Sequence, residues 1–176
     1  MLENYSGVLE PQHCKELISS FEDNVELHEK IENLGIKFTQ LNLTQHELSG
    51  GLQNLVYTKI VMVTERYRSK YKYLPSLNCL EQFRVKKYEP VEDVFDWHVD
   101  VVNRATAKRF LAIQFYLNTV DEGGKTFFQV GEEHTVIDPV EGSVLCFPPT
   151  PMFPHCGQST VSEPKYILTT YLHYAD

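Results

Sequence analysis

The 176-residue chain lacks the features that mark membrane, secreted and nucleic-acid-binding proteins. It has no apolar run of 18 residues, so no transmembrane helix and no membrane partner are expected. Its first residues, MLENYSGVLE, lack the basic start and apolar stretch of a secretory signal, so we expect a cytoplasmic location. The 16 Lys and Arg stand against 24 Asp and Glu, giving a formal net charge of -8. This balance disfavours a nucleic-acid partner, because binding phosphate backbones requires clustered basic side chains. The basic stretch Lys86-Lys87 is short, and we expect ordinary solvated positions there.

Cysteine is also scarce. The chain contains no CxxC pair, so neither a disulfide framework nor a zinc ribbon is indicated, and we expect four reduced thiols: Cys14, Cys79, Cys146 and Cys156. Internal repeats, low-complexity segments and interdomain linkers are absent as well. The length therefore fits one domain that spans residues 1–176.

Helical periodicity is confined to the N-terminal part of the chain. From Pro11 to Phe21 the apolar residues recur at i, i+3, i+4 and i+7, which predicts an amphipathic helix. The segment from Leu48 to Tyr71 predicts a longer helix that packs against a sheet. Residues 24–47 are mixed and polar and indicate only short strand and loop. We therefore expect residues 1–78 to form a helical support region.

After Pro75 the chain changes to short β-type segments. Between them lie turn signals such as EGG at 122–124, PVEG at 139–142 and FPPTPMFP at 147–154. The predicted strands cover residues 80–88, 95–101, 109–118, 126–129, 135–138, 143–147 and 166–174. This pattern predicts an α+β fold in which a jelly-roll core, residues 79–176, carries the helices on the outer face of one sheet.

The most informative segment is FDWHVD, residues 95–100. His98 and Asp100 are two positions apart, and residues two apart in an extended strand point to the same face. A third ligand from His155 would complete a 2-His-1-carboxylate set, which is typical of non-haem Fe(II) oxygenases. A hydrogen-bonded core histidine is the alternative interpretation of His98 alone. Strand alternation predicts that three apolar residues lie on the opposite face: Phe95, Trp97 and Val99.

Two charged residues favour the metal interpretation. Asp100 would carry a large desolvation cost if it were buried without a cation, and a divalent metal relieves that cost. In the last predicted strand Lys165 shares a face with Thr169, and a lysine that points into a small barrel needs an anionic partner. A lysine at the strand edge that reaches solvent is the alternative. An organic dianion beside the metal fits both residues.

Four blocks of the C-terminal half carry a resemblance to a known family. They are KYEPVEDVFDWHVD (87–100), RFLAIQFYLNTVDEGGKTFF (109–128), VIDPVEGSVLCFPP (136–149) and PHCGQSTVSEPKYILTTYLHY (154–174). From about residue 80 to the end, the chain resembles the Fe(II)- and 2-oxoglutarate-dependent dioxygenases, most closely the prolyl 4-hydroxylase branch. The segment GVLEPQHCKELISSFED is a weaker match to that branch's entry helix. The resemblance implies a double-stranded β-helix core.

Roles follow from the resemblance position by position. It implies that His98, Asp100 and His155 bind Fe(II), and that Lys165 pairs with the distal carboxylate of 2-oxoglutarate. A lysine at this position favours the collagen-type and microbial prolyl hydroxylases, because the oxygen-sensing animal relatives have arginine there.

Further residues are expected around the cosubstrate. The resemblance implies that Tyr116 donates its hydroxyl to the same carboxylate and that Tyr88 lines the pocket; the alternative is that both are ordinary core aromatic residues. Strand alternation adds further candidates for the pocket wall: Ala112, Gln114 and Thr169.

The implied activity is hydroxylation of an unactivated C–H bond, with O2 consumed, succinate and CO2 released, and L-ascorbate as an optional reductant. A prolyl residue in a peptide or protein is the favoured substrate. Hydroxylation of a free amino acid or another small metabolite is an alternative, as are an inactive jelly-roll binding module and a zinc hydrolase. Nucleobase repair is disfavoured because no arginine-rich motif follows His155. The sequence gives no oligomeric state.

The chain departs from that branch in the loop EPVEDVFDW, residues 89–97. Relatives often have a glycine after the proline, where this chain has Val91. They also have a tyrosine three positions before the histidine, where this chain has Phe95. Metal binding does not depend on either residue, but we expect the substrate side of the site to differ.

Overall fold

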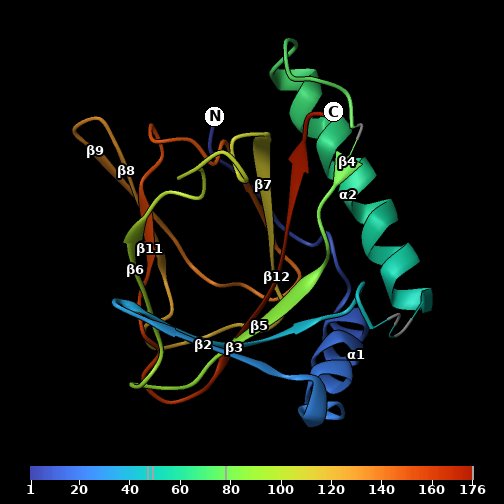
Figure 1. Ribbon diagram of the computed structural model, residues 1–176, viewed down its shortest axis with the longest axis vertical. Coiled ribbons are helices and arrows are strands. Elements are labelled where there is room, and N and C mark those ends of the chain that lie inside the picture. The colour runs from blue at the N-terminus through green and yellow to red at the C-terminus, as the bar shows by residue number, and fades with distance from the viewer. Residues whose placement is uncertain (47, 49, 78, 176) are drawn as a thin grey trace.

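The fold is a twelve-stranded antiparallel sheet that curls into a barrel, with two helices on one side (Figure 1). The computed structural model describes residues 1–46, 48, 50–77 and 79–175. Helix α1 covers Pro11–Glu22 and helix α2 covers Gly50–Lys70, close to the predicted ranges. Pro11 stands in the first turn of α1, where the missing N–H has no intrahelical partner to lose.

The strands form one continuous path, β1-β10-β7-β12-β5-β3-β6-β11-β8-β9, from which β2 pairs with β3 and β4 pairs with β12. This arrangement is the expected double-stranded β-helix core. The bounds of the strands are β1 Glu3–Tyr5, β2 Glu29–Asn33, β3 Ile36–Asn42, β4 Cys79–Leu80, β5 Arg84–Tyr88, β6 Val94–His98, β7 Arg109–Tyr116, β8 Thr126–Val130, β9 Glu133–Ile137, β10 Val144–Phe147, β11 His155–Gly157 and β12 Lys165–His173.

The N-terminal region contributes strands as well as the expected helices. Strand β1 pairs with β10, and the β2–β3 hairpin joins the sheet because β3 pairs with both β5 and β6. The sequence concealed β2 because only Ile31 in it is even partly buried, so its residues show no apolar alternation. The support region therefore closes part of the barrel wall.

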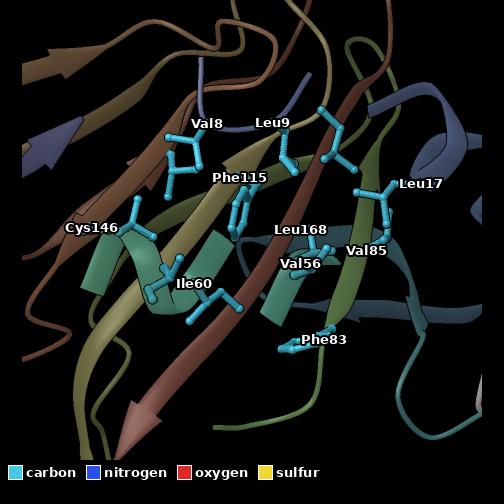
Figure 2. Close-up of a cluster of buried hydrophobic side chains, with 14 of the residues drawn as sticks. Val8, Leu9, Leu17, Val56, Ile60, Phe83, Val85, Phe115, Cys146 and Leu168 are labelled. Carbon is cyan, nitrogen blue, oxygen red and sulfur yellow. The ribbon is translucent and has the colours of Figure 1, made fainter. Parts of the chain in front are cut away.

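The main hydrophobic core lies between the helices and the outer face of the sheet, where side chains from α1, α2 and several strands interdigitate (Figure 2). Each such buried aliphatic or aromatic side chain contributes about 1.5–3 kcal/mol. Members that are almost fully shielded from solvent include Leu17, Val56, Ile60, Val85, Phe115 and Leu168. The helices thus supply apolar burial outside the barrel and leave the inner face available for polar groups.

The four cysteines are free, in agreement with the expected reduced thiols. Among the described residues, no helix combines the length and hydropathy that crossing a membrane requires.

The turn between β5 and β6 holds a strained residue. Val91 has φ 65°, the one positive φ outside glycine in the described chain. Its amide donates to the carbonyl of Thr160 at 2.9 Å, and the Asp93 carboxylate accepts from the amide of Glu89 at 2.8 Å, so the turn is fixed from both sides. A β-branched residue in the left-handed region costs about 1–2 kcal/mol. This is the position where relatives often have glycine.

Val91→Gly is therefore expected to raise the free energy of unfolding by about 1 kcal/mol, because relief of the φ strain outweighs the added entropy of the unfolded chain. Urea denaturation measures the change. Val161→Gly is the control, since Val161 is also exposed but has no positive φ and should lose stability. A loss of stability in both variants would show that the turn is unstrained.

Candidate active site

Three candidate metal ligands meet at one end of the barrel interior. His98 ends β6, His155 begins β11, and the pairing of these strands sets the two Cα atoms directly opposite each other. Asp100 follows β6 by two residues, and one ligand atom from each side chain lies within 4.8 Å of the others. The Asp100 carboxylate oxygens stand 3.6 Å from Nε2 of His98 and 3.8 Å from Nε2 of His155.

Backbone carbonyls orient both imidazoles. Nδ1 of His98 lies 2.7 Å from the carbonyl oxygen of Asp96, and Nδ1 of His155 lies 3.1 Å from that of Phe153. Because a carbonyl can only accept, each Nδ1 carries the hydrogen. Each Nε2 is therefore left with its lone pair directed toward the shared space beside Asp100. This is the arrangement that metal-binding histidines adopt.

The electrostatics of the cluster suit a divalent cation. Burial lowers the pKa of His155 to about 4, so its ring is neutral at pH 7. Burial alone would raise the pKa of Asp100, but the contact with His98 and the charge of Lys86 hold it below its usual range. A neutral imidazole and an ionised carboxylate are the forms that bind metal. Among the described residues, no other group of three such side chains converges in this way.

Phe95 lies on the same side as His98, so the predicted opposite placement is wrong for this residue. Its ring stacks on the His98 imidazole, with centroids 3.7 Å apart and an interplanar angle of 2°. The cause is a bulge: Gly157 pairs with Phe95 and His155 with His98, so β6 has one more residue than β11 between the pairs. An extra residue rotates the strand and breaks the alternation. Trp97 does remain on the exposed surface.

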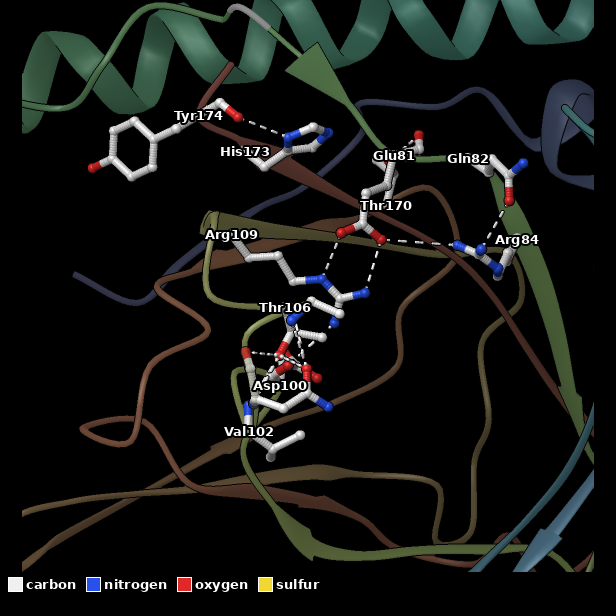
Figure 3. Close-up of polar contacts among 12 residues, drawn as sticks. Glu81, Gln82, Arg84, Asp100, Val102, Thr106, Arg109, Thr170, His173 and Tyr174 are labelled. Carbon is white, nitrogen blue, oxygen red and sulfur yellow. Dashed lines mark hydrogen bonds and ion pairs between the residues drawn. The ribbon is translucent and has the colours of Figure 1, made fainter. Parts of the chain in front are cut away.

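A polar chain supports Asp100 from outside the cavity (Figure 3). The Arg109 guanidinium donates to the backbone carbonyl of Asp100 at 3.1 Å and makes two bonds, at 2.6 and 2.8 Å, to the Glu81 carboxylate. It also lies 3.9 Å above the Tyr171 ring. Burial and the nearby Asp100 charge raise the pKa of Tyr171 well above its ordinary value, so its hydroxyl remains a donor to the Asp100 carboxylate. The sequence did not identify these three supporting residues.

Lys165 lies in the same cavity as the three candidate ligands. Its Cα pairs with that of Tyr88, its side chain is 4% exposed, and its ammonium donates to the carbonyl of Gly124 at 2.6 Å. Burial lowers its pKa to about 7. Within the described chain no carboxylate forms an ion pair with it. A buried ammonium short of a countercharge fits an anionic ligand.

The EGG turn presents the carbonyl that holds Lys165. Gly123 has φ +80°, and a Cβ on it would stand 2.4 Å from the backbone oxygen of Ser159. Only glycine fits there, because both the φ value and the close approach exclude a side chain. The turn therefore fixes the Gly124 carbonyl against Lys165.

The other predicted pocket residues divide into two groups. Four of them line the cavity: Tyr88, Ala112, Gln114 and Thr169. Tyr116 is fully buried behind the wall, and its hydroxyl bonds to that of Thr126 at 2.8 Å. Thr126 itself lines the cavity. The Tyr116 ring is also 5.5 Å from the Lys165 ammonium, and Thr126 is a cavity residue that the sequence did not single out.

Lys86 is another cavity residue that the sequence missed. The pair Lys86 and Lys87 was expected to be ordinary solvated surface. Lys87 fits that description, since it pairs with Glu22 at 3.0 Å and Glu89 at 2.8 Å. Lys86 instead points inward with Tyr88, as strand alternation requires once β5 is a barrel strand.

Comparison with family models gives one match. The model described as the 2OG-Fe(II) oxygenase superfamily matches residues 83–173, which is more than half of the chain. A search of the curated proteins found no match.

Several solved structures share the fold. A viral collagen prolyl hydroxylase from Paramecium Bursaria Chlorella virus-1, solved as its 2OG complex, has 20% identity and a TM-score of 0.73, with 99% of this chain and 96% of that chain covered. A Trichoplax adhaerens prolyl hydroxylase, in complex with a hypoxia inducible factor peptide fragment, has 14% identity and a TM-score of 0.82, covering 98% and 83%. A Pseudomonas putida prolyl-4-hydroxylase has 14% identity and a TM-score of 0.77, covering 98% and 92%.

Proposed function

This chain belongs to the 2OG-Fe(II) oxygenase superfamily, and from this premise we propose that it hydroxylates a prolyl residue in a peptide or protein. One observation carries the proposal: a single cavity holds the cluster of His98, Asp100 and His155 together with the buried, unpaired ammonium of Lys165. When bound, Fe(II) supplies the redox centre at which O2 and 2-oxoglutarate react, with succinate and CO2 as coproducts and L-ascorbate as an optional reductant.

The protein's part in this chemistry is to hold and orient. His98, Asp100 and His155 would bind one face of the metal and leave the other positions open. The ring of Phe95 against His98, and that of Phe147 at 4.8 Å from His155, shield the ligands from water. No protein nucleophile is required for this reaction class, so the work of the site is to fix geometry and to exclude solvent.

At the cosubstrate end, Lys165 would bind the distal carboxylate of 2-oxoglutarate as a point charge. The Thr126 hydroxyl on the same wall would add a hydrogen bond, and Tyr116 behind it fixes that hydroxyl. Tyr88, Gln114 and Thr169 would form the remaining walls around the carbon chain. A dianion in this position supplies the negative charge that the buried lysine lacks.

The prolyl substrate is supported by the fold neighbours. Proteins of this fold include a collagen prolyl hydroxylase and a prolyl hydroxylase solved with a peptide fragment. A second candidate substrate is a free amino acid, which the cationic Lys86 in the cavity favours. Both candidates use the same metal and the same cosubstrate.

The activity itself is tested with anaerobically purified protein supplied with Fe(II), 2-oxoglutarate and O2. Succinate release above background is expected with proline-rich peptides or L-proline, and mass spectrometry should find a product heavier by one oxygen atom. The His98→Ala protein is the inactive control. If no substrate gives turnover and Fe(II) with 2-oxoglutarate produces no new absorption band, the protein is an inactive binding module.

The metal ligands can be tested apart from turnover. Asp100→Ala is expected to weaken Fe(II) or Co(II) binding by at least about a hundredfold, because even the loss of a supporting hydrogen bond to a metal ligand costs 10–100-fold. Calorimetric titration measures the affinity, and circular dichroism should show an intact fold. His134→Ala, which removes an exposed histidine on β9, should bind metal as the parent does. Equal losses in both variants would remove Asp100 from the ligand set.

Lys165 makes cosubstrate binding depend on pH. In the free protein its pKa is about 7, so the ammonium is present below pH 7 and is progressively lost above it. The dissociation constant of 2-oxoglutarate, measured with Mn(II)-loaded protein, should therefore rise by up to about tenfold per pH unit above pH 7. Lys165→Arg should flatten this profile, because arginine stays charged. A flat profile in the unaltered protein would place the carboxylate anchor elsewhere.

A further inference from the structure

Lys86 is a second lysine of the barrel interior, and it has no anionic partner in the described chain. It lies on β5 between two residues that face the other way, and it lines the same cavity as Asp100 and His155. Its ammonium stands 4.9 Å from the Phe38 ring centroid and 5.6 Å from that of Phe95. These aromatic faces attract a cation but supply no hydrogen-bond acceptor.

The charged side chains near Lys86 already contact other residues. Arg109 and Arg84 both turn toward Glu81, at 2.6 Å and 4.0 Å respectively. The Asp100 carboxylate is in contact with the two histidines and Tyr171. Burial lowers the pKa of Lys86 to about 8, which leaves it charged at neutral pH. Lys86 is therefore the one cavity cation whose hydrogen-bond donors meet no acceptor in the described residues.

Charge counting separates Lys86 from the cosubstrate. The two positive charges of a divalent metal balance the two negative charges of 2-oxoglutarate, and the positive charge of Lys165 balances the negative charge of Asp100. The charge of Lys86 is left over in the loaded site. Lys86 also acts on the candidate ligands, because its charge lowers the pKa of both Asp100 and His155. Lys86 is thus a cation beside the metal, in the space that a substrate must enter.

No ion pair or hydrogen bond among the described residues explains why this side chain points inward. Lys86 is half-buried, and its ammonium faces the Phe38 and Phe95 rings, so its donors are accessible to a ligand in the cavity. The same strand places Lys87 outside in two ion pairs, so β5 does not lack a better position for a lysine. The position of Lys86 is explained by a ligand.

We propose that Lys86 binds a carboxylate of the substrate, so that this enzyme selects substrates with a negative charge close to the carbon that is oxidised. The inference rests on the proposed function and narrows its substrate class. Such a carboxylate comes either from an acidic residue next to the target in a peptide or from the α-carboxylate of a free amino acid.

The test uses two matched pairs of probes, each differing in one carboxylate. The first pair is a blocked proline peptide with Asp beside the proline and the same peptide with Asn. The second pair is L-proline and L-prolinamide. Binding is titrated without O2 on protein loaded with Mn(II) and 2-oxoglutarate, so that no turnover occurs. In at least one pair the carboxylate member is expected to bind at least about tenfold more tightly, the effect of one charge-assisted hydrogen bond.

Lys86→Gln should abolish this preference, whereas the control Lys87→Gln should keep it. The pair that shows the preference identifies the source of the carboxylate. No preference in either pair, or a preference that survives Lys86→Gln, overturns the inference.

Two further results keep the outcomes distinct. If Lys86→Gln weakens 2-oxoglutarate binding as strongly as Lys165→Gln does, Lys86 serves the cosubstrate and the inference fails. If succinate is released with any probe while the carboxylate preference is absent, the oxygenase activity stands and only the role of Lys86 is lost. If neither the probes nor any peptide supports succinate release, the result contradicts the proposed function itself.

Discussion

The pairing of β6 with β11 is the constraint on which the site depends. It sets His98 opposite His155, and its bulge turns Phe95 inward against the His98 ring. Because the two imidazoles come from paired strands, their separation follows from backbone hydrogen bonds rather than from side-chain packing. Asp100 lies just beyond the end of β6, where the chain is free to turn its carboxylate between them. A shift of register by one residue would remove one ligand from the cavity.

Most of the apolar burial that stabilises the fold lies on the opposite side of the sheet from the candidate site. Hydrophobic burial is concentrated outside the barrel, between the two helices and the strands. The smaller inner cluster is aromatic and packs around the charged residues instead. This division explains how the domain keeps the buried Lys165 and the half-buried Lys86 on the inner face, although neither forms an ion pair with a described residue. Their destabilising effect is offset by apolar contacts on the other face of the same strands.

Local pattern was enough to predict both helices, most strands of the core, and the residues that converge as the candidate metal site. Local pattern was not enough where the register between neighbouring strands determines which way a side chain points. The inward turn of Phe95 depends on the bulge, and the place of Thr126 on the cavity wall, with its hydroxyl bonded to that of Tyr116, depends on a contact between β7 and β8. Lys86 was taken for solvated surface because β3, which covers its strand, has no periodic signature. The placement of these side chains depends on contacts between residues that are far apart in the sequence.

The charge distribution ties these features together. The chain as a whole is acidic, with a formal net charge of -8, yet its cavity holds Lys86 and Lys165. An acidic surface gives no long-range attraction to anions, so selection takes place inside, where low dielectric strengthens each contact. Burial has moved the pKa values of these lysines to about 8 and about 7, close to neutrality. An anion that enters restores the charged form of its lysine, so binding and protonation are coupled.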